Sequence, residues 1–160
     1  MANEDVTVIP LGLTPLVLVV EDELTPRLVV TYMVRALGYR AVSCRNGRAA
    51  LQFLKGHPWQ VRLLLTDLVM AGMDGGELSE RARDLEPALM TALMASPYDP
   101  YANELLSGYR DVPFIPKPVS LGDLADKLER LLGIPSRPTK PPRSRRALRR
   151  RRSSGSHQGG

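Results

Sequence analysis

The chain has 160 residues, of which 43% are hydrophobic and 24% are charged. These proportions are typical of a soluble globular protein and exclude a fibrous repeat or a wholly disordered chain. The length suits one compact domain with extensions and argues against a second domain of ordinary size. The single cysteine, Cys44, excludes an internal disulfide framework and cannot build a zinc site alone, so we expect a small buried apolar side chain.

The N-terminal part of the sequence indicates neither a membrane span nor a secretory signal. Its most apolar stretch, residues 11–20, is interrupted by Pro15 and is shorter than the roughly 20 residues that a spanning helix needs. Glu4 and Asp5 stand where a signal peptide would be positively charged. We therefore expect a cytoplasmic protein.

The formal net charge of +5 is unevenly distributed. Residues 135–160 hold nine basic residues and no acidic one, which leaves residues 1–134 with 13 basic and 17 acidic residues and a charge of −4. Because this Pro- and Arg-rich tail has almost no apolar side chain to bury, we expect it to be disordered. It is either a solvated extension or an electrostatic contact for nucleic acid, anionic lipid or an acidic protein, although no aromatic residue lies among its arginines to stack on bases.

The first expected element is a buried strand over Leu16–Val20, an unbroken apolar run that stops at Glu21. Continuous apolar strands of this kind are covered on both faces, as in parallel sheets. Thr25 and Pro26 then predict the start of a helix, with Thr25 as its N-cap and Pro26 in the first turn. Apolar residues follow at helical spacing until Gly38, the pattern of a helix packed on a core: Leu28, Val29, Tyr32, Met33, Ala36 and Leu37.

The alternation of strand and helix continues to residue 133. Further strands are expected at residues 41–44, 61–66, 89–95 and 112–115. Further helices are expected at residues 49–55 after an Asn46-Gly47 turn, at 77–85, at 98–106, and from a Ser120 cap to Gly133. Five strands alternating with five helices predict an α/β fold with a parallel sheet. The expected organisation is an N-terminal extension (1–15), one domain (16–134) and the tail (135–160).

In such a sheet the functional site lies at the carboxyl ends of the strands, near the point where strand order reverses. The residues at those ends are polar or charged: Glu21, Asp22, Glu23, Asp67, Ser96 and Lys117. Several carboxylates at one sheet edge repel one another unless a cation lies between them, and Mg²⁺ prefers oxygen ligands of this kind. A lysine and a hydroxyl group beside them complete a cradle for a phosphoryl group, which aspartate can accept. The sequence therefore predicts a phosphorylatable carboxylate with a bound Mg²⁺ ion.

Three segments carry a resemblance to a known family. Residues 18–23 (LVVEDE), 65–75 (LTDLVMAGMDG) and 114–118 (FIPKP) resemble the signature blocks of bacterial response-regulator receiver domains, in the right order. The resemblance covers residues 16–133 and implies the CheY-like, flavodoxin-like fold: a single doubly wound parallel sheet of five strands in the order 2-1-3-4-5. One block alone is weak support, but three in register are specific.

The resemblance also implies roles for particular residues. Asp67 is expected to accept a phosphoryl group from a histidine kinase or phosphotransfer protein. Glu21, Asp22 and Asp67 are expected to hold Mg²⁺ together with the backbone carbonyl of Val69. Lys117 matches the lysine that contacts the phosphoryl oxygens, and its bond to the following proline is expected to be cis.

Two further positions match the switch of the family. Ser96 matches the hydroxyl that turns toward the phosphoryl group, and Phe114 matches the aromatic residue whose rotation reports activation. Thr91 is the alternative to Ser96, but it would shorten the fourth strand and lengthen the distance to Lys117. Phe114 is at the same time expected to be a core aromatic residue.

Each assignment has a purely structural alternative. Glu21 and Asp22 could cap the first helix, Asp67 could be an ordinary turn residue, and Ser96 could begin a turn with Pro97. Packing roles are expected for three other large side chains: Trp59, Met70 and Met73. The two histidines, His57 and His157, lack partners in the sequence that would make them ligands.

The sequence departs from the family at two positions. Ala71 stands where the family usually has proline, which should loosen the loop after Asp67. Pro97 follows Ser96 where the family has a small residue whose backbone N–H donates to the phosphoryl group, and proline has no N–H. One charge-assisted hydrogen bond worth about 1.5–3 kcal/mol would then be missing.

The leading hypothesis is a stand-alone receiver that is phosphorylated on Asp67 with Mg²⁺ and signals in a phosphorelay through protein contacts. The resemblance places the downstream partner on residues 98–132, from Tyr98 to Leu132. A second hypothesis, motivated by Pro97, is an interaction module that does not depend on phosphorylation. A third is a receiver that regulates nucleic-acid binding by the arginine-rich tail. None of these is an enzyme in the usual sense.

Overall fold

The computed structural model describes residues 14–133. Nearly all of the expected N-terminal extension and the whole expected tail therefore lie outside the described residues. Within the described part of the chain, no helix is long and apolar enough to cross a membrane.

Five strands alternate with five helices along the described chain. The strands are β1 (Leu16–Val20), β2 (Arg40–Cys44), β3 (Val61–Asp67), β4 (Met90–Ala95) and β5 (Phe114–Pro116). The helices are α1 (Leu24–Ala36), α2 (Gly47–Gly56), α3 (Gly75–Leu85), α4 (Pro100–Ser107) and α5 (Leu121–Leu132). All strand pairs are parallel and the sheet order is β2-β1-β3-β4-β5, which confirms the expected doubly wound, flavodoxin-like sheet.

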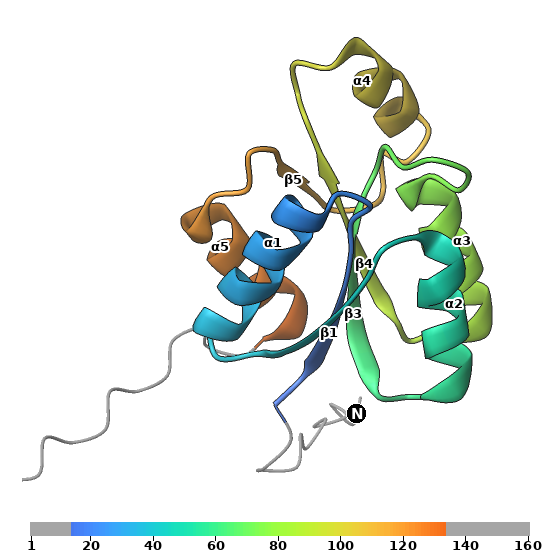
Figure 1. Ribbon diagram of the computed structural model, residues 1–160, viewed down its shortest axis with the longest axis vertical. Coiled ribbons are helices and arrows are strands. Elements are labelled where there is room, and N and C mark those ends of the chain that lie inside the picture. The colour runs from blue at the N-terminus through green and yellow to red at the C-terminus, as the bar shows by residue number, and fades with distance from the viewer. Residues whose placement is uncertain (1–13, 134–160) are drawn as a thin grey trace, which may run out of the picture.

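Helices cover both faces of the sheet, with α1 and α5 on one side and α2 and α3 on the other (Figure 1). Val34 of α1 and Leu124 of α5 share a buried apolar cluster with Val17 of β1. Leu54 of α2 belongs to a second cluster with Leu18, which points to the opposite face of the same strand. Every side chain of β1 is buried, as the unbroken apolar run predicts. This double packing holds the carboxyl ends of β1 and β3 side by side.

Several helix ends differ from the predictions. Thr25 is not the N-cap of α1, because the helix begins at Leu24 with Glu23 at the cap position and no side-chain cap bond. The side chain of Glu21 instead accepts the backbone N–H of Glu23 at 3.2 Å. Asn46 is an N-cap and not only a turn residue, since its side chain accepts the N–H of Ala49 at 2.8 Å and α2 starts at Gly47.

The later helices follow the same rule that a capping side chain sets the first turn. Helix α4 starts at Pro100, later than predicted, because Asp99 accepts the N–H of Tyr101 at 3.0 Å. The Ser120 cap of α5 is confirmed by its bond to the N–H of Asp123 at 3.0 Å.

The apolar stripe expected to pack α1 on the core is only partly buried. Leu28, Val29 and Tyr32 are 58%, 46% and 74% exposed, whereas Val30 and Thr31 are buried. The helix carries apolar residues on two sides, so periodicity could not show which side faces the sheet. The buried hydroxyl of Thr31 has a hydrogen-bond partner, because it donates to the carbonyl of Arg27 at 2.6 Å.

Other packing expectations have mixed outcomes. Met70 is buried and Met73 is half-buried against the core, as predicted. Trp59 is 71% exposed, so the packing role expected for it is wrong, and so is the prediction of Phe114 as a core aromatic residue, because its side chain is 39% exposed. Cys44 is only half-buried, because it lies on the edge strand β2.

Candidate functional site

Three carboxylates meet at the carboxyl edge of the sheet. Glu21 and Asp22 directly follow β1, and Asp67 is the last residue of the neighbouring strand β3. One oxygen from each lies within 4.8 Å of the others. Glu21 and Asp67 are almost completely buried, at 1% and 6% exposure, whereas Asp22 is exposed. A hard cation at this point would therefore be bound by protein oxygens on one side and remain open to solvent on the other.

Lys117, which follows β5, brings a positive charge into this cluster. Its Nζ lies 2.9 Å from Oε2 of Glu21 and 3.2 Å from Oδ1 of Asp67. Lys117 is joined to Pro118 by a cis peptide bond, as expected. One lysine cannot balance three carboxylates, so negative charge remains in surplus at the site.

The environment of the site shifts the titration of Asp67. Its pKa is raised from its ordinary value of 3.8 to about 6: burial is the largest cause, the attraction of Lys117 opposes it, and the nearby charges of Glu21 and Asp22 add to it. Burial alone would lower the pKa of Lys117, but its hydrogen bond to Glu21 and the charge of Asp67 prevail and raise it. The donor set is thus hard, acidic and short of positive charge, which fits Mg²⁺.

The structural alternative for Glu21 and Asp22, that they cap the first helix, explains only part of what these side chains do. Asp22 makes no side-chain cap to α1, and Glu21 caps Glu23 while its second oxygen faces Lys117. The buried position of Asp67 likewise differs from that of an ordinary turn residue. Helix capping alone therefore does not account for the cluster.

Ser96 lies near the acidic cluster without joining it. Asp67 pairs with Met94 in the sheet, so Ser96 follows two residues further along the neighbouring strand. Its Oγ accepts the N–H of Tyr98 at 3.4 Å, and no hydrogen bond connects it to Asp67 among the described residues. The alternative Thr91 pairs with Leu64, well inside the sheet, and is farther from the carboxyl edge.

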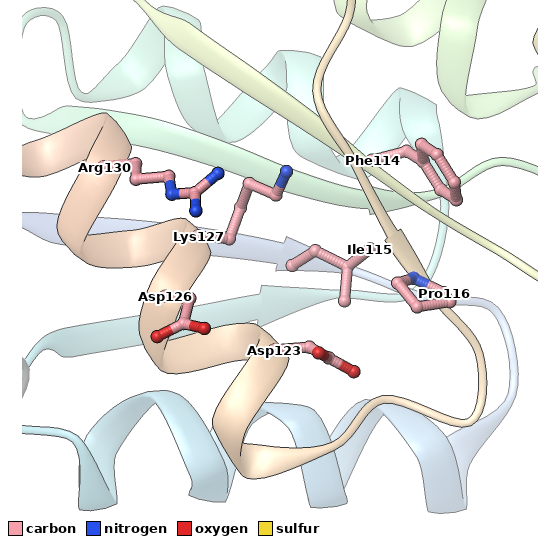
Figure 2. Close-up of a pocket in the computed structure, with 7 residues that line it drawn as sticks. All are labelled: Phe114, Ile115, Pro116, Asp123, Asp126, Lys127 and Arg130. Atoms are coloured by element: carbon pink, nitrogen blue, oxygen red, sulfur yellow. The ribbon is translucent and has the colours of Figure 1, made fainter.

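Phe114 borders two grooves on the face formed by α4, β5 and α5. A groove of about 210 Å³ lies between β5 and α5, lined by Phe114, Ile115, Pro116, Asp123, Asp126, Lys127 and Arg130. Figure 2 shows the carboxylates of Asp123 and Asp126 nearer the start of α5 and the cationic side chains of Lys127 and Arg130 nearer its end. A second, more apolar groove of about 310 Å³ runs along α4 to Phe114. The exposed ring of Phe114 thus borders both grooves.

Sequence reasoning missed two residues that shape the site. Gly75 brings the start of α3 against the end of β3: its N–H donates to the carbonyl of Leu68 at 2.8 Å, and a Cβ there would collide with the carbonyl oxygen of Asp67. Arg27 donates from α1 to the carbonyls of Glu21 and Asp22 at 2.8 and 3.3 Å. The Asp74-Gly75 pair was a visible turn signal, whereas the partners of Arg27 could not be read from the sequence.

Comparisons with known proteins agree with this geometry. Residues 17–129 match the family described as response regulator receiver domain. The chain is 32% identical over 116 residues to the response regulator receiver protein CpdR of Brucella abortus (strain 2308), covering 72% of this chain and 95% of that one. It is 30% identical over 122 residues to the sensor kinase CckA of the same organism, covering 72% of this chain but 12% of that protein.

Solved structures show the same fold. The receiver domain of the hybrid histidine kinase CckA superimposes with a TM-score of 0.61 at 29% identity, covering 73% of this chain and 98% of that one. A chain of the co-crystal structure of the Saccharomyces cerevisiae phosphotransfer protein Ypd1 with the receiver domain of Ssk1 gives a TM-score of 0.63 at 18% identity, covering 74% and 88%.

The parallel sheet and the acidic cluster at its carboxyl edge define an α/β domain of the two-component signalling class. The chain belongs to the response regulator receiver domain family.

Proposed function

We propose that this receiver is a signalling protein that accepts a phosphoryl group on Asp67. An oxygen of Asp67 attacks the phosphorus of a phosphohistidine, the bond from phosphorus to the histidine nitrogen breaks, and an aspartyl phosphate forms. The phosphodonor is a histidine kinase or a phosphotransfer protein. The observation that carries this proposal is the convergence of three carboxylates within 4.8 Å beside a single lysine.

Mg²⁺ would be held by Glu21, Asp22, Asp67 and the backbone carbonyl of Val69, and would supply positive charge to the phosphoryl oxygens during transfer. Lys117 already lies 3.2 Å from Asp67 and would contact the same oxygens. Ser96 would donate its hydroxyl once the loop after β4 moves, because its proton is not used in the bond to Tyr98. Glu21 holds Lys117 in place and so orients the cation that faces the acceptor.

The phosphodonor would dock on the exposed apolar side of α1. This side of α1 exposes four apolar side chains by 46% to 74%: Leu24, Leu28, Val29 and Tyr32. Leu24 directly follows residues 21–23, the acidic turn between β1 and α1. A partner that covers these side chains would bring its phosphohistidine close to Asp67. Burial of such an apolar surface is favourable by about 25 cal/mol per Å².

Output would be through protein contacts on the face of residues 98–132. Tyr98 and Tyr101 are 89% and 57% exposed, and both grooves end at Phe114. Rotation of Phe114 would change both grooves together, which links the phosphorylation site to the partner surface. We place the whole process in the cytoplasm.

The test is phosphorylation of the full chain by acetyl phosphate, with and without Mg²⁺, followed by intact-mass spectrometry. We expect one added phosphoryl group in the presence of Mg²⁺ and none in Asp67→Asn. Beryllofluoride should shift the amide NMR signals of Phe114 in the wild-type protein only. An unlabelled protein at saturating donor and Mg²⁺ would refute the proposal.

Pro97 supports a second candidate function, an interaction module that does not depend on phosphorylation. Its carbonyl accepts a bond from Asn103 at 2.9 Å, which ties the loop after β4 to α4, and it has no N–H to offer a phosphoryl group. In that case Asp67→Asn would leave partner binding unchanged.

The predicted binding of nucleic acid by the tail concerns residues that lie outside the described part of the chain. Its test is salt-dependent binding that disappears when residues 137–160 are deleted.

A further inference from the structure

The guanidinium of Arg27 lies against the backbone of the acidic turn. Its Nη1 donates to the carbonyl of Glu21 at 2.8 Å and to the carbonyl of Asp22 at 3.3 Å. The backbone of Arg27 is part of α1, where its own carbonyl accepts the hydroxyl of Thr31. A single side chain therefore fastens the acidic turn to the helix that follows it.

The two acidic residues depend on this contact to different degrees. Glu21 has several other bonds: its N–H donates to the carbonyl of Cys44 at 3.2 Å, and its two carboxylate oxygens accept from Glu23 and Lys117. Asp22 is exposed, and the bond from Arg27 is the one hydrogen bond that the described residues make to it. Within the described chain, Arg27 is thus the group that holds the peptide carbonyl of Asp22.

We propose that Arg27 is a positioning residue of the metal site, which keeps the Asp22 carboxylate oriented toward the cation by holding the peptide groups of Glu21 and Asp22. This role presupposes the Mg²⁺-dependent function proposed above. A planar guanidinium suits it because one group can donate to two neighbouring carbonyls. Arg27 reaches the cluster from the backbone side and leaves the carboxylate oxygens free.

Positioning and charge make opposite predictions for the removal of Arg27. A cation near Mg²⁺ repels it, so a purely electrostatic role predicts tighter Mg²⁺ binding when the side chain is neutral. Loss of an outer partner that orients a ligand typically weakens metal binding by about 10- to 100-fold. The sign of the change therefore separates the two explanations.

The experiment is a Mg²⁺ titration of the full chain, followed by the amide NMR shifts of Asp22 and Asp67. Arg27→Met removes both bonds and the charge, and Arg27→Lys keeps the charge. Arg35→Met is a matched control, because Arg35 also donates from α1 to a backbone carbonyl, that of Ala41 at 2.8 Å, but at the far end of the helix. We expect the Mg²⁺ dissociation constant to rise about tenfold in Arg27→Met, to rise less in Arg27→Lys, and to stay unchanged in Arg35→Met.

The possible failures are distinguishable. If the Mg²⁺ dissociation constant of Arg27→Met equals that of the wild-type protein or is lower, the positioning role is overturned and the proposed function stays intact. A wild-type protein without Mg²⁺-dependent shifts would overturn both. Urea unfolding separates general destabilisation, which Arg27→Met and Arg35→Met should share, from the effect on Mg²⁺. If Arg27→Met does not fold, the Mg²⁺ dissociation constant of Arg27→Lys is the test. A value equal to that of the wild-type protein then overturns the positioning role.

Discussion

Replacing Asp67 by asparagine should stabilise the fold in the absence of divalent cations. The carboxylate is 6% exposed and lies with Glu21 and Asp22 in a cluster that has Lys117 as its cation. Asparagine has nearly the same shape but no charge, so it removes the repulsion and the desolvation of the ion together. Lys117 keeps its bond to Glu21 at 2.9 Å in the variant.

The magnitude follows from the pKa of Asp67, which rises from 3.8 to about 6 in the folded protein. A difference of this size corresponds to about 3 kcal/mol, a figure that already includes the opposing attraction of Lys117. Between the two pKa values the folded state binds more protons than the unfolded state, so stability falls as pH rises. The cost of Asp67 is absent below pH 4 and fully present above pH 6, by the same order-of-magnitude argument.

Urea unfolding of the wild-type protein and Asp67→Asn at several pH values, in the presence of a chelator, measures this difference. We expect the variant to be more stable by about 1–3 kcal/mol at pH 8 and the gap to close toward pH 4. Added Mg²⁺ should narrow the gap at pH 8, because it stabilises the wild-type folded state by binding to it. A variant that is less stable than the wild type at pH 8, or a gap that does not vary with pH, would refute the electrostatic account.

Three other substitutions test separate parts of the structure. Lys117→Met should destabilise the fold by about 3–5 kcal/mol, because it leaves the buried carboxylate of Glu21 without a cation; an unchanged urea midpoint would contradict this. Gly75→Ala should cost more than 1 kcal/mol in the same assay because its Cβ meets backbone, whereas Gly56→Ala has open space around it and should be neutral or stabilising by about 0.5–1 kcal/mol. Pro97→Ala should increase beryllofluoride affinity at least tenfold by restoring an N–H donor worth about 1.5–3 kcal/mol, and equal affinity by isothermal calorimetry would show that this donor is not used.

The helix α1 shows where prediction from the sequence was insufficient. The apolar spacing from Leu28 to Leu37 correctly indicated a helix, but Leu28, Val29 and Tyr32 lie on the exposed side. A helix with apolar residues on two sides can be rotated without violating its periodicity. The choice between the two sides depends on packing against β1 and α5, which are far apart in the sequence.

Phe114 illustrates a related limit. Its position in the FIP block matched the switch aromatic of the family, and its apolar character predicted burial. The strand β5 has three residues and forms an edge of the sheet, so its first side chain lies between the two grooves at 39% exposure. Whether an edge residue is covered depends on the helices beside it and not on the residue itself.

The fold class and the approximate location of the site could be predicted from the order of the amino acids alone. Unbroken apolar runs that end at Glu21 and Asp67 indicate buried parallel strands, and parallel strands bring their carboxyl ends to one edge. The neighbours that complete the site could be found only in the folded chain: the contact of Lys117 with both carboxylates, the approach of Gly75 to Asp67, and the contact of Arg27 with the acidic turn. Local patterns record what a residue prefers, whereas distances of a few ångströms between distant segments depend on how the whole core is packed.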